Sequence, residues 1–230
     1  MKSIFKLSLI FYLVLSLGVG SIFAAETGAE KSHGSVVTAL SQGRIIDAEV
    51  DYMFRINDID ILENLSELIV KGRILSNSES VVKNPPKGGI SGYTLTKVEI
   101  AEVFSGEASV GDIITLVEPY FEALLGDGKT YIITRSGYLP SIIEGEYILF
   151  LVKNQGSDPR RNGSYEMYNT IMGRYPVPKQ TNIEGSAIIS NQEMSLTEDT
   201  NTLDYREVFE DVLDKYNKKN KICALGPYST

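Results

Sequence analysis

The feature that most constrains the fold is a central block, Leu68 to Val177, that reads as strands and turns. In its clearest strand, Tyr93 to Phe104, Val98 and Ile100 alternate with charged residues, which is typical of one buried and one solvated face. Strands joined by turns, without helices between them, pair antiparallel. Closing such a sheet into a barrel removes its exposed edges. We therefore predict a mainly-β domain built on a small antiparallel barrel.

The same block contains the other expected strands. They are Leu68–Leu75, Ile113–Val117, Tyr131–Thr134, Glu146–Lys153, Tyr165–Met172 and a last edge at Arg174–Val177. The Glu146–Lys153 run is nearly all apolar, so we expect a central strand that is buried on both faces. Ser76-Asn77-Ser78 is expected to form a turn that closes the first strand.

The first residues have the layout of a secretory signal peptide. Lys2 and Lys6 flank the start of an apolar run, Leu7 to Phe23, and Ile22-Phe23-Ala24 offers a small-residue cleavage site. The alternative is a retained anchor, because the run is roughly long enough to cross a bilayer. Acidic rather than basic residues follow the run, so we expect residues 1–24 to be removed and the protein to be secreted or held at the cell surface.

Cysteine content and charge restrict the class of protein. The single cysteine, Cys223, excludes an intrachain disulfide, and the roughly 205 residues after the leader suffice to bury a core without one. Export without disulfides favours a bacterial source, with the protein on the extracellular side of the membrane. The formal net charge is −8, or −10 without the two leader lysines. Nucleic acid needs clustered cations, so it is not expected as a partner.

The segments around the central block complete the domain organisation. We expect a flexible tether at 25–44, because it is rich in Gly, Ser and Thr, and a short helical lead-in at 45–67, because apolar residues there recur at steps of three. Residues 68–219 are expected to form the barrel domain with its C-terminal helix, and 220–230 a tail.

The stretch from Leu203 to Lys219 predicts the C-terminal amphipathic helix. Apolar residues at steps of three and four give one stripe, made of Tyr205, Val208, Phe209, Val212, Leu213 and Tyr216. We expect this stripe to pack against the barrel; docking of a partner protein is the alternative.

Three segments carry a resemblance to a known group of proteins. They are Ser66–Ile74, Thr96–Gly106 and Glu144–Leu151, in this order and with wide gaps. Together they resemble exported bacterial proteins of largely unassigned function, whose barrel is similar to the OB-like fold of netrin-type and metalloproteinase-inhibitor-like domains. The resemblance implies an OB-like barrel. The eukaryotic inhibitors carry an amino-terminal cysteine and disulfides that this chain lacks, so their metal chelation does not transfer.

Aromatic residues give the best indication of a binding site. Exposed tyrosine on the loops of a rigid barrel suits contacts with protein or carbohydrate. The candidates lie in the long excursion after Pro119 and on the late strands: Tyr120, Phe121, Tyr131, Tyr138, Tyr165, Tyr168 and Tyr175.

Catalytic and metal signatures are weak. The only histidine, His33, lies in the expected tether, where it cannot easily serve as a positioned base or as a zinc ligand. We therefore expect no catalytic residue, metal or cofactor.

The sequence thus predicts a secreted or cell-surface binding module whose partner is an extracellular protein or a cell-envelope component. The alternatives are an inhibitor of a secreted protease and an exported hydrolase that uses carboxylates. Glu118, Glu144 and Glu146 are the carboxylates through which the hydrolase alternative can be tested.

Overall fold

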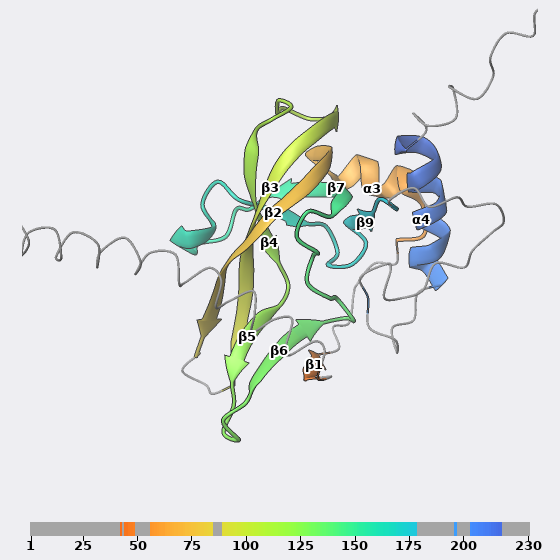
Figure 1. Ribbon diagram of the computed structural model, residues 1–230. Helices are drawn as coiled ribbons and strands as arrows, with labels where there is room; N and C mark the ends of the chain where they lie inside the picture. The colour runs from red at the N-terminus through yellow and green to blue at the C-terminus, as the bar shows by residue number, and fades with distance from the viewer. Residues whose placement is uncertain are drawn as a thin grey trace, which may run out of the picture.

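The computed structural model describes residues 42, 44–48, 56–84, 89–178, 196 and 203–217, and shows a mainly-β chain built around a closed barrel (Figure 1). The expected leader at 1–24, most of the expected tether at 25–44 and the expected tail at 220–230 lie outside these residues. The side chains of 76–78, 203 and 204 also lie outside them.

Five strands form the barrel. They are β2 (Leu68–Lys83), β3 (Ser91–Ser105), β4 (Ile113–Glu118), β8 (Tyr165–Met167) and β7 (Glu146–Lys153). Each pairs with the next in that order, and β7 returns to pair with β2, which closes the ring. The expected OB-like barrel is thus confirmed. One detail differs from the expectation: the β4–β8 pairing is parallel, whereas the other four pairings are antiparallel.

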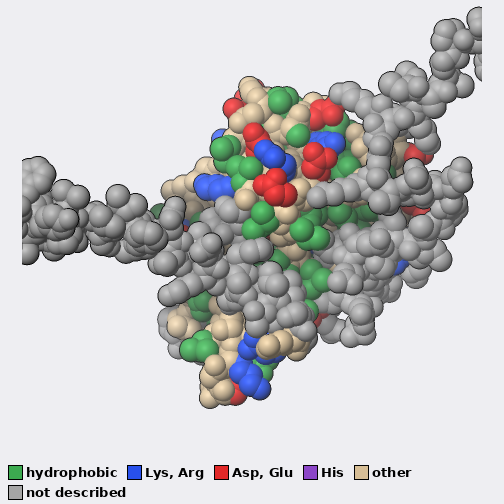
Figure 2. Space-filling model, viewed as in Figure 1, with side chains coloured by type: hydrophobic (Ala, Val, Ile, Leu, Met, Phe, Trp, Pro, Cys, Tyr) green, Lys and Arg blue, Asp and Glu red, His purple; other side chains and the backbone are tan. Residues whose placement is uncertain are grey.

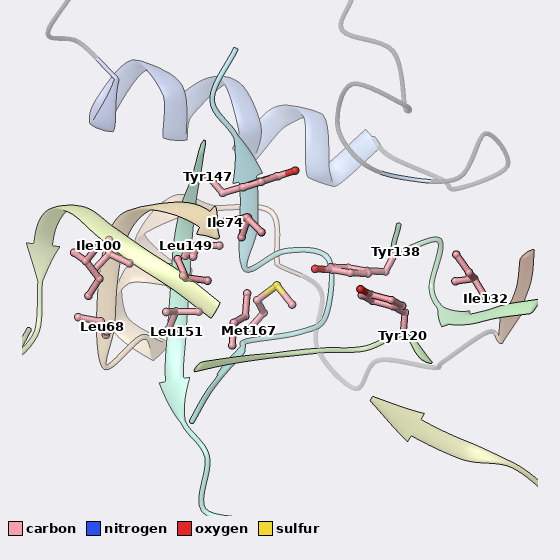
Figure 3. Packing of buried hydrophobic residues seen from close by; sticks show 13 residues of the cluster. Leu68, Ile74, Ile100, Tyr120, Ile132, Tyr138, Tyr147, Leu149, Leu151 and Met167 are labelled. Atoms are coloured by element: carbon pink, nitrogen blue, oxygen red, sulfur yellow. The ribbon is translucent and has the colours of Figure 1, made fainter. Parts of the chain in front are cut away.

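Strand β7 separates two hydrophobic cores, because its side chains alternate between opposite faces. Tyr147, Leu149 and Leu151 point into the barrel, where they join the first core (Figure 3). Ile148 and Phe150 belong to the second core on the outer face. All five side chains are buried, so the expectation of a central strand buried on both faces is confirmed.

Two helices cover the outer face of the barrel. The second core packs helix α4 (Leu203–Tyr216) through Tyr205, Val208, Phe209 and Val212, which confirms the expected packing of the C-terminal stripe. Helix α3 (Ile59–Leu65) lies beside α4 in Figure 1, and Glu63 joins the two. It pairs with Lys215 at 2.6 Å and accepts a hydrogen bond from Tyr216.

A second, three-stranded sheet extends the structure beyond the barrel. It consists of β1 (Ile45–Ala48), β6 (Thr130–Arg135) and β5 (Phe121–Leu124), with β6 in the middle. It lies next to the far end of the long β2–β3 hairpin (Figure 1), where the Glu122 N–H donates to the Ser80 hydroxyl at 2.8 Å. The first part of the helical lead-in expected at 45–67 is therefore a strand, because its backbone finds a parallel partner in β6.

Two expected strand ends were wrong for identifiable reasons. The turn expected at Ser76-Asn77-Ser78 is continuous strand, because shifts of register let β2 remain paired with β3. Conversely, the strand expected at Tyr165–Met172 ends at Met167, because Asn169 and Thr170 adopt positive φ of 52° and 46° and begin a turn. The expected edge strand at Arg174–Val177 is present as β9 (Arg174–Pro176), and it pairs with β7.

We predict that Gly106→Ala destabilises the fold more than Gly111→Ala. Both glycines have similar positive φ, 94° and 90°, so alanine strains both backbones. A Cβ at Gly106 would in addition lie 2.3 Å from the Glu67 carbonyl oxygen, whereas one at Gly111 would meet nothing within 4 Å. The extra loss for Gly106→Ala should be about 1–3 kcal/mol, measured by urea unfolding followed by circular dichroism. Equal losses would contradict the close backbone approach.

Candidate functional site

A pocket of about 270 Å³ opens where the β2–β3 hairpin meets the β7–β8 connection. The hairpin contributes Lys83, Ser91, Gly92 and Tyr93. The end of β4 and the residue after it contribute Val117 and Pro119, and the end of β6 contributes Arg135. The region around β8 contributes Arg161, Glu166, Met167 and Thr170. The pocket thus combines three cations and one carboxylate with an apolar wall.

Asp158 fastens the β7–β8 connection to the hairpin beside this pocket. Its Oδ1 caps the short 3₁₀ helix η1 (Pro159–Arg161) by accepting from the Arg160 N–H at 3.1 Å. Its Oδ2 lies 2.6 Å from the Lys83 ammonium and accepts from the Tyr93 hydroxyl at 2.6 Å. One carboxylate therefore holds together two segments that are far apart in the sequence.

We call the contacts of Asp158 with Lys83 and Tyr93 the Asp158 clamp, and they shift the pKa values of Asp158 and Tyr93. The Lys83 ammonium, together with the Tyr93 hydroxyl, holds the pKa of Asp158 well below its usual range. Burial, and then the hydrogen bond to Asp158, raises the pKa of Tyr93 to about 12. At neutral pH the carboxylate is charged and the phenol is protonated, which is the combination that the clamp requires.

The Tyr93 ring also contacts two of the three cations of the pocket. Lys83 Nζ and the Arg161 guanidinium carbon each lie 5.2 Å from its centroid, within the range of cation–π attraction. Arg161 also forms an ion pair with Glu166, which in turn accepts a hydrogen bond from the Asn154 amide at 3.1 Å. The cations on this side of the pocket are thus fixed by neighbours.

A buried charged network lies beneath the pocket wall. Glu118, the last residue of β4, is fully buried between the wall residues Val117 and Pro119. Its carboxylate accepts from the Tyr138 hydroxyl at 2.6 Å and from the Ser141 N–H at 3.0 Å. The Thr96 hydroxyl of the adjacent strand donates as well. The end of β4 is therefore held by groups from two other parts of the chain, strand β3 and the segment from Tyr138 to Ser141.

Arg174 completes this network from strand β9. Its Nη1 lies 3.6 Å from the Glu118 carboxylate and donates to the Ser141 hydroxyl at 2.8 Å. Its guanidinium stacks on the Tyr138 ring with 3.8 Å between the guanidinium carbon and the ring centroid. Burial raises the pKa of Tyr138 well above its usual value, so the phenol remains a donor to Glu118. The Glu118–Arg174 ion pair is structural, since neither charged group is exposed to solvent.

The aromatic candidates from the sequence do not form a common exposed surface. Tyr120, Phe121, Tyr138 and Tyr175 are buried, so the expectation that they are exposed for binding was wrong. Figure 3 shows Tyr120 and Tyr138 side by side at one end of the barrel core, with 6.4 Å between ring centroids. These rings fill the core because the excursion after Pro119 folds back over the barrel.

The other three candidates are half-buried and lie apart from the pocket lining: Tyr131, Tyr165 and Tyr168. Tyr165 packs against the first core and Tyr168 against the second. Tyr131 donates to Asp127 at 2.9 Å. Ligand contact by these three residues stays a prediction.

The carboxylates tied to the hydrolase alternative are engaged in ion pairs. Glu144 and Glu146 lie 3.1 Å from Arg73 and from Lys71 respectively. Glu118 is buried against Arg174. The pocket lining contains one carboxylate among the described residues, Glu166, and it too is paired with an arginine.

Sequence reasoning missed the residues that line the pocket, although it placed several of their strands. The available signal was the Asp158-Pro159-Arg160-Arg161 run, in which a capping residue and a proline precede two cations in a loop. Nothing local in the sequence shows that this loop returns to Lys83 and Tyr93, because that contact depends on closure of the barrel.

Comparison of this chain with protein-family models, curated proteins and solved structures found no match. Within the described ranges, none of the helices has the length and apolar character needed to cross a membrane. The part of the chain that the structure covers also contains no group of three or more metal-ligating side chains.

We predict that Lys83→Ala raises the pKa of Asp158 toward its ordinary value. Because the folded state favours the carboxylate, the clamp contributes stability above the ordinary pKa of an aspartate and loses it as pH falls through the lower folded pKa. Carboxyl-carbon NMR titration of Asp158 measures the shift directly. Lys97→Ala, which removes an exposed lysine bonded to Thr115, is the control. An unchanged Asp158 pKa in Lys83→Ala would contradict the clamp.

Proposed function

We propose that this protein is an exported binding module whose ligand occupies the pocket between the β2–β3 hairpin and the β7–β8 connection. The observation that carries the proposal is the place of this pocket on the barrel. In OB-fold domains, ligands such as oligosaccharides and oligonucleotides bind on the face of the second and third strands and between the loops that join strands one to two and four to five. In this chain those strands are β3 and β4, and those loops are the β2–β3 and β7–β8 connections.

The residues that line the pocket also support ligand binding, independently of the comparison with OB-fold domains. Ligand sites are concave, with an apolar wall and a few positioned polar groups. Here Val117, Pro119 and Met167 supply the wall. Lys83 and Arg161 are held in place by Asp158, Glu166 and the Tyr93 ring, which lowers the entropy lost when a ligand orders them.

The proposal places the ligand outside the cell, in keeping with the secretory leader. An extracellular protein or a component of a bacterial cell envelope then supplies it.

Binding also fits the chemistry of the pocket better than hydrolysis by two carboxylates, which requires an acid and a second carboxylate flanking one bond. The described lining offers a single carboxylate, and that carboxylate is neutralised by Arg161.

Filling the pocket tests this proposal. Ser91→Phe places a ring in the pocket from the first residue of β3, whereas Ser109→Phe adds the same ring at an exposed position outside the lining. Binding of neutral sugars, acidic sugars and short peptides is followed by backbone-amide NMR shifts. We expect saturable shifts around Gly92 and Met167 for one of these classes, weakened at least about tenfold by Ser91→Phe and unchanged by Ser109→Phe.

The proposal is contradicted if Ser91→Phe, shown to be folded by its NMR spectrum, binds every probe as the unsubstituted protein does. Shifts that map to a face away from the pocket would contradict it equally.

A further inference from the structure

The pocket has the opposite charge to the chain as a whole. Three cations and one carboxylate line it, in a protein of formal net charge −8. On the face shown in Figure 2, by contrast, acidic and basic side chains lie next to one another over the upper barrel. A concave site whose charge opposes that of the whole protein attracts anions locally, while the remaining surface repels them at long range.

Pairing of the charges identifies which cation is available. Lys83 is neutralised by Asp158 and Arg161 by Glu166. Arg135, at the end of β6, is exposed and makes no hydrogen bond or ion pair through its side chain with any residue that the structure describes. Its guanidinium is therefore the uncompensated charge of the described lining.

Neutral groups of the pocket suit a polyhydroxylated ligand. Ser91 and Thr170 line it, and their hydroxyls have no hydrogen-bond partner among the described residues. The Val117–Pro119–Met167 wall offers an apolar surface of the kind that packs on the C–H face of a sugar ring. The volume, about 270 Å³, is just below the range usual for small-molecule sites, so the pocket accepts one or two rings rather than a long segment of polymer.

We infer that the pocket binds an acidic sugar unit, with Arg135 holding its carboxylate or phosphate. A guanidinium binds either group through two parallel N–H donors, which gives both affinity and orientation. The ring hydroxyls then face Ser91 and Thr170, and the apolar side of the ring faces Met167. The inference deepens the proposed function and rests on it, since it names the ligand class of the same pocket.

The experiment compares three probes that share one pyranose ring: glucose, glucuronate and glucose 6-phosphate. Affinity is measured by NMR titration for the unsubstituted protein and for Arg135→Gln, Arg135→Lys and Arg160→Gln. Arg160 is the matched control, because it lies on η1 outside the lining, is 60% exposed, and its replacement changes the net charge equally. Glucuronate and glucose 6-phosphate separate a carboxylate site from a phosphate site.

The expected result is that at least one acidic probe binds at least about tenfold more tightly than glucose. Arg135→Gln should remove this preference, Arg135→Lys should keep part of it, and Arg160→Gln should leave it intact.

Equal affinity for glucose and both acidic probes, or full preference in Arg135→Gln, would overturn the inference, as would the absence of binding by all three. The proposed function fails separately: it is contradicted if Ser91→Phe leaves binding of the whole probe panel unchanged, or if the shifts map to a face away from the pocket. A neutral sugar or a peptide that binds in the pocket and is blocked by Ser91→Phe would keep the binding module and refute the acidic ligand.

Discussion

The ion pair between Glu118 and Arg174 is the interaction on which the rest of the structure depends. It joins the end of β4, the excursion that carries Tyr138 and Ser141, and the edge strand β9. The backbone carbonyl of Arg174 also accepts a hydrogen bond from Tyr205 of helix α4 at 2.6 Å. Burying two charges is costly unless their remaining hydrogen-bonding groups are satisfied. The four segments must therefore come together in one arrangement.

The buried ion pair also fixes one wall of the pocket, because two wall residues are the sequence neighbours of Glu118. Val117 and Pro119 form part of the pocket wall, and the carboxylate between them is anchored in the protein interior. The opposite side of the pocket is held by the partly buried Asp158, which joins the β2–β3 hairpin to the β7–β8 connection. The pocket thus has one wall fixed by the buried Glu118 network and one fixed by the hydrogen bonds and ion pair of Asp158.

The features that could be predicted from the sequence are those that depend on a local pattern of residues. Alternation and apolar runs identified most strands, the double burial of Glu146–Lys153 and the stripe of helix α4, because each depends on residues close together in the chain. The sequence did not allow prediction of β1, whose partner β6 lies about 85 residues later. The sequence also led us to expect Tyr120 and Tyr138 at the surface, whereas both are buried in the core. A tyrosine has the same local pattern in both settings, and only the fold of the excursion after Pro119 decides between them.

A double-mutant cycle between Glu118 and Arg174 tests the central claim most directly. The free energy of unfolding is measured in urea for Glu118→Gln, Arg174→Met and the double variant. The account predicts that each single change costs about 3–5 kcal/mol, because each leaves a buried group without its charged partner. The double variant should cost less than the sum of the two by at least about 1 kcal/mol. Additive losses would show that the two charges do not act as one unit and would contradict the account.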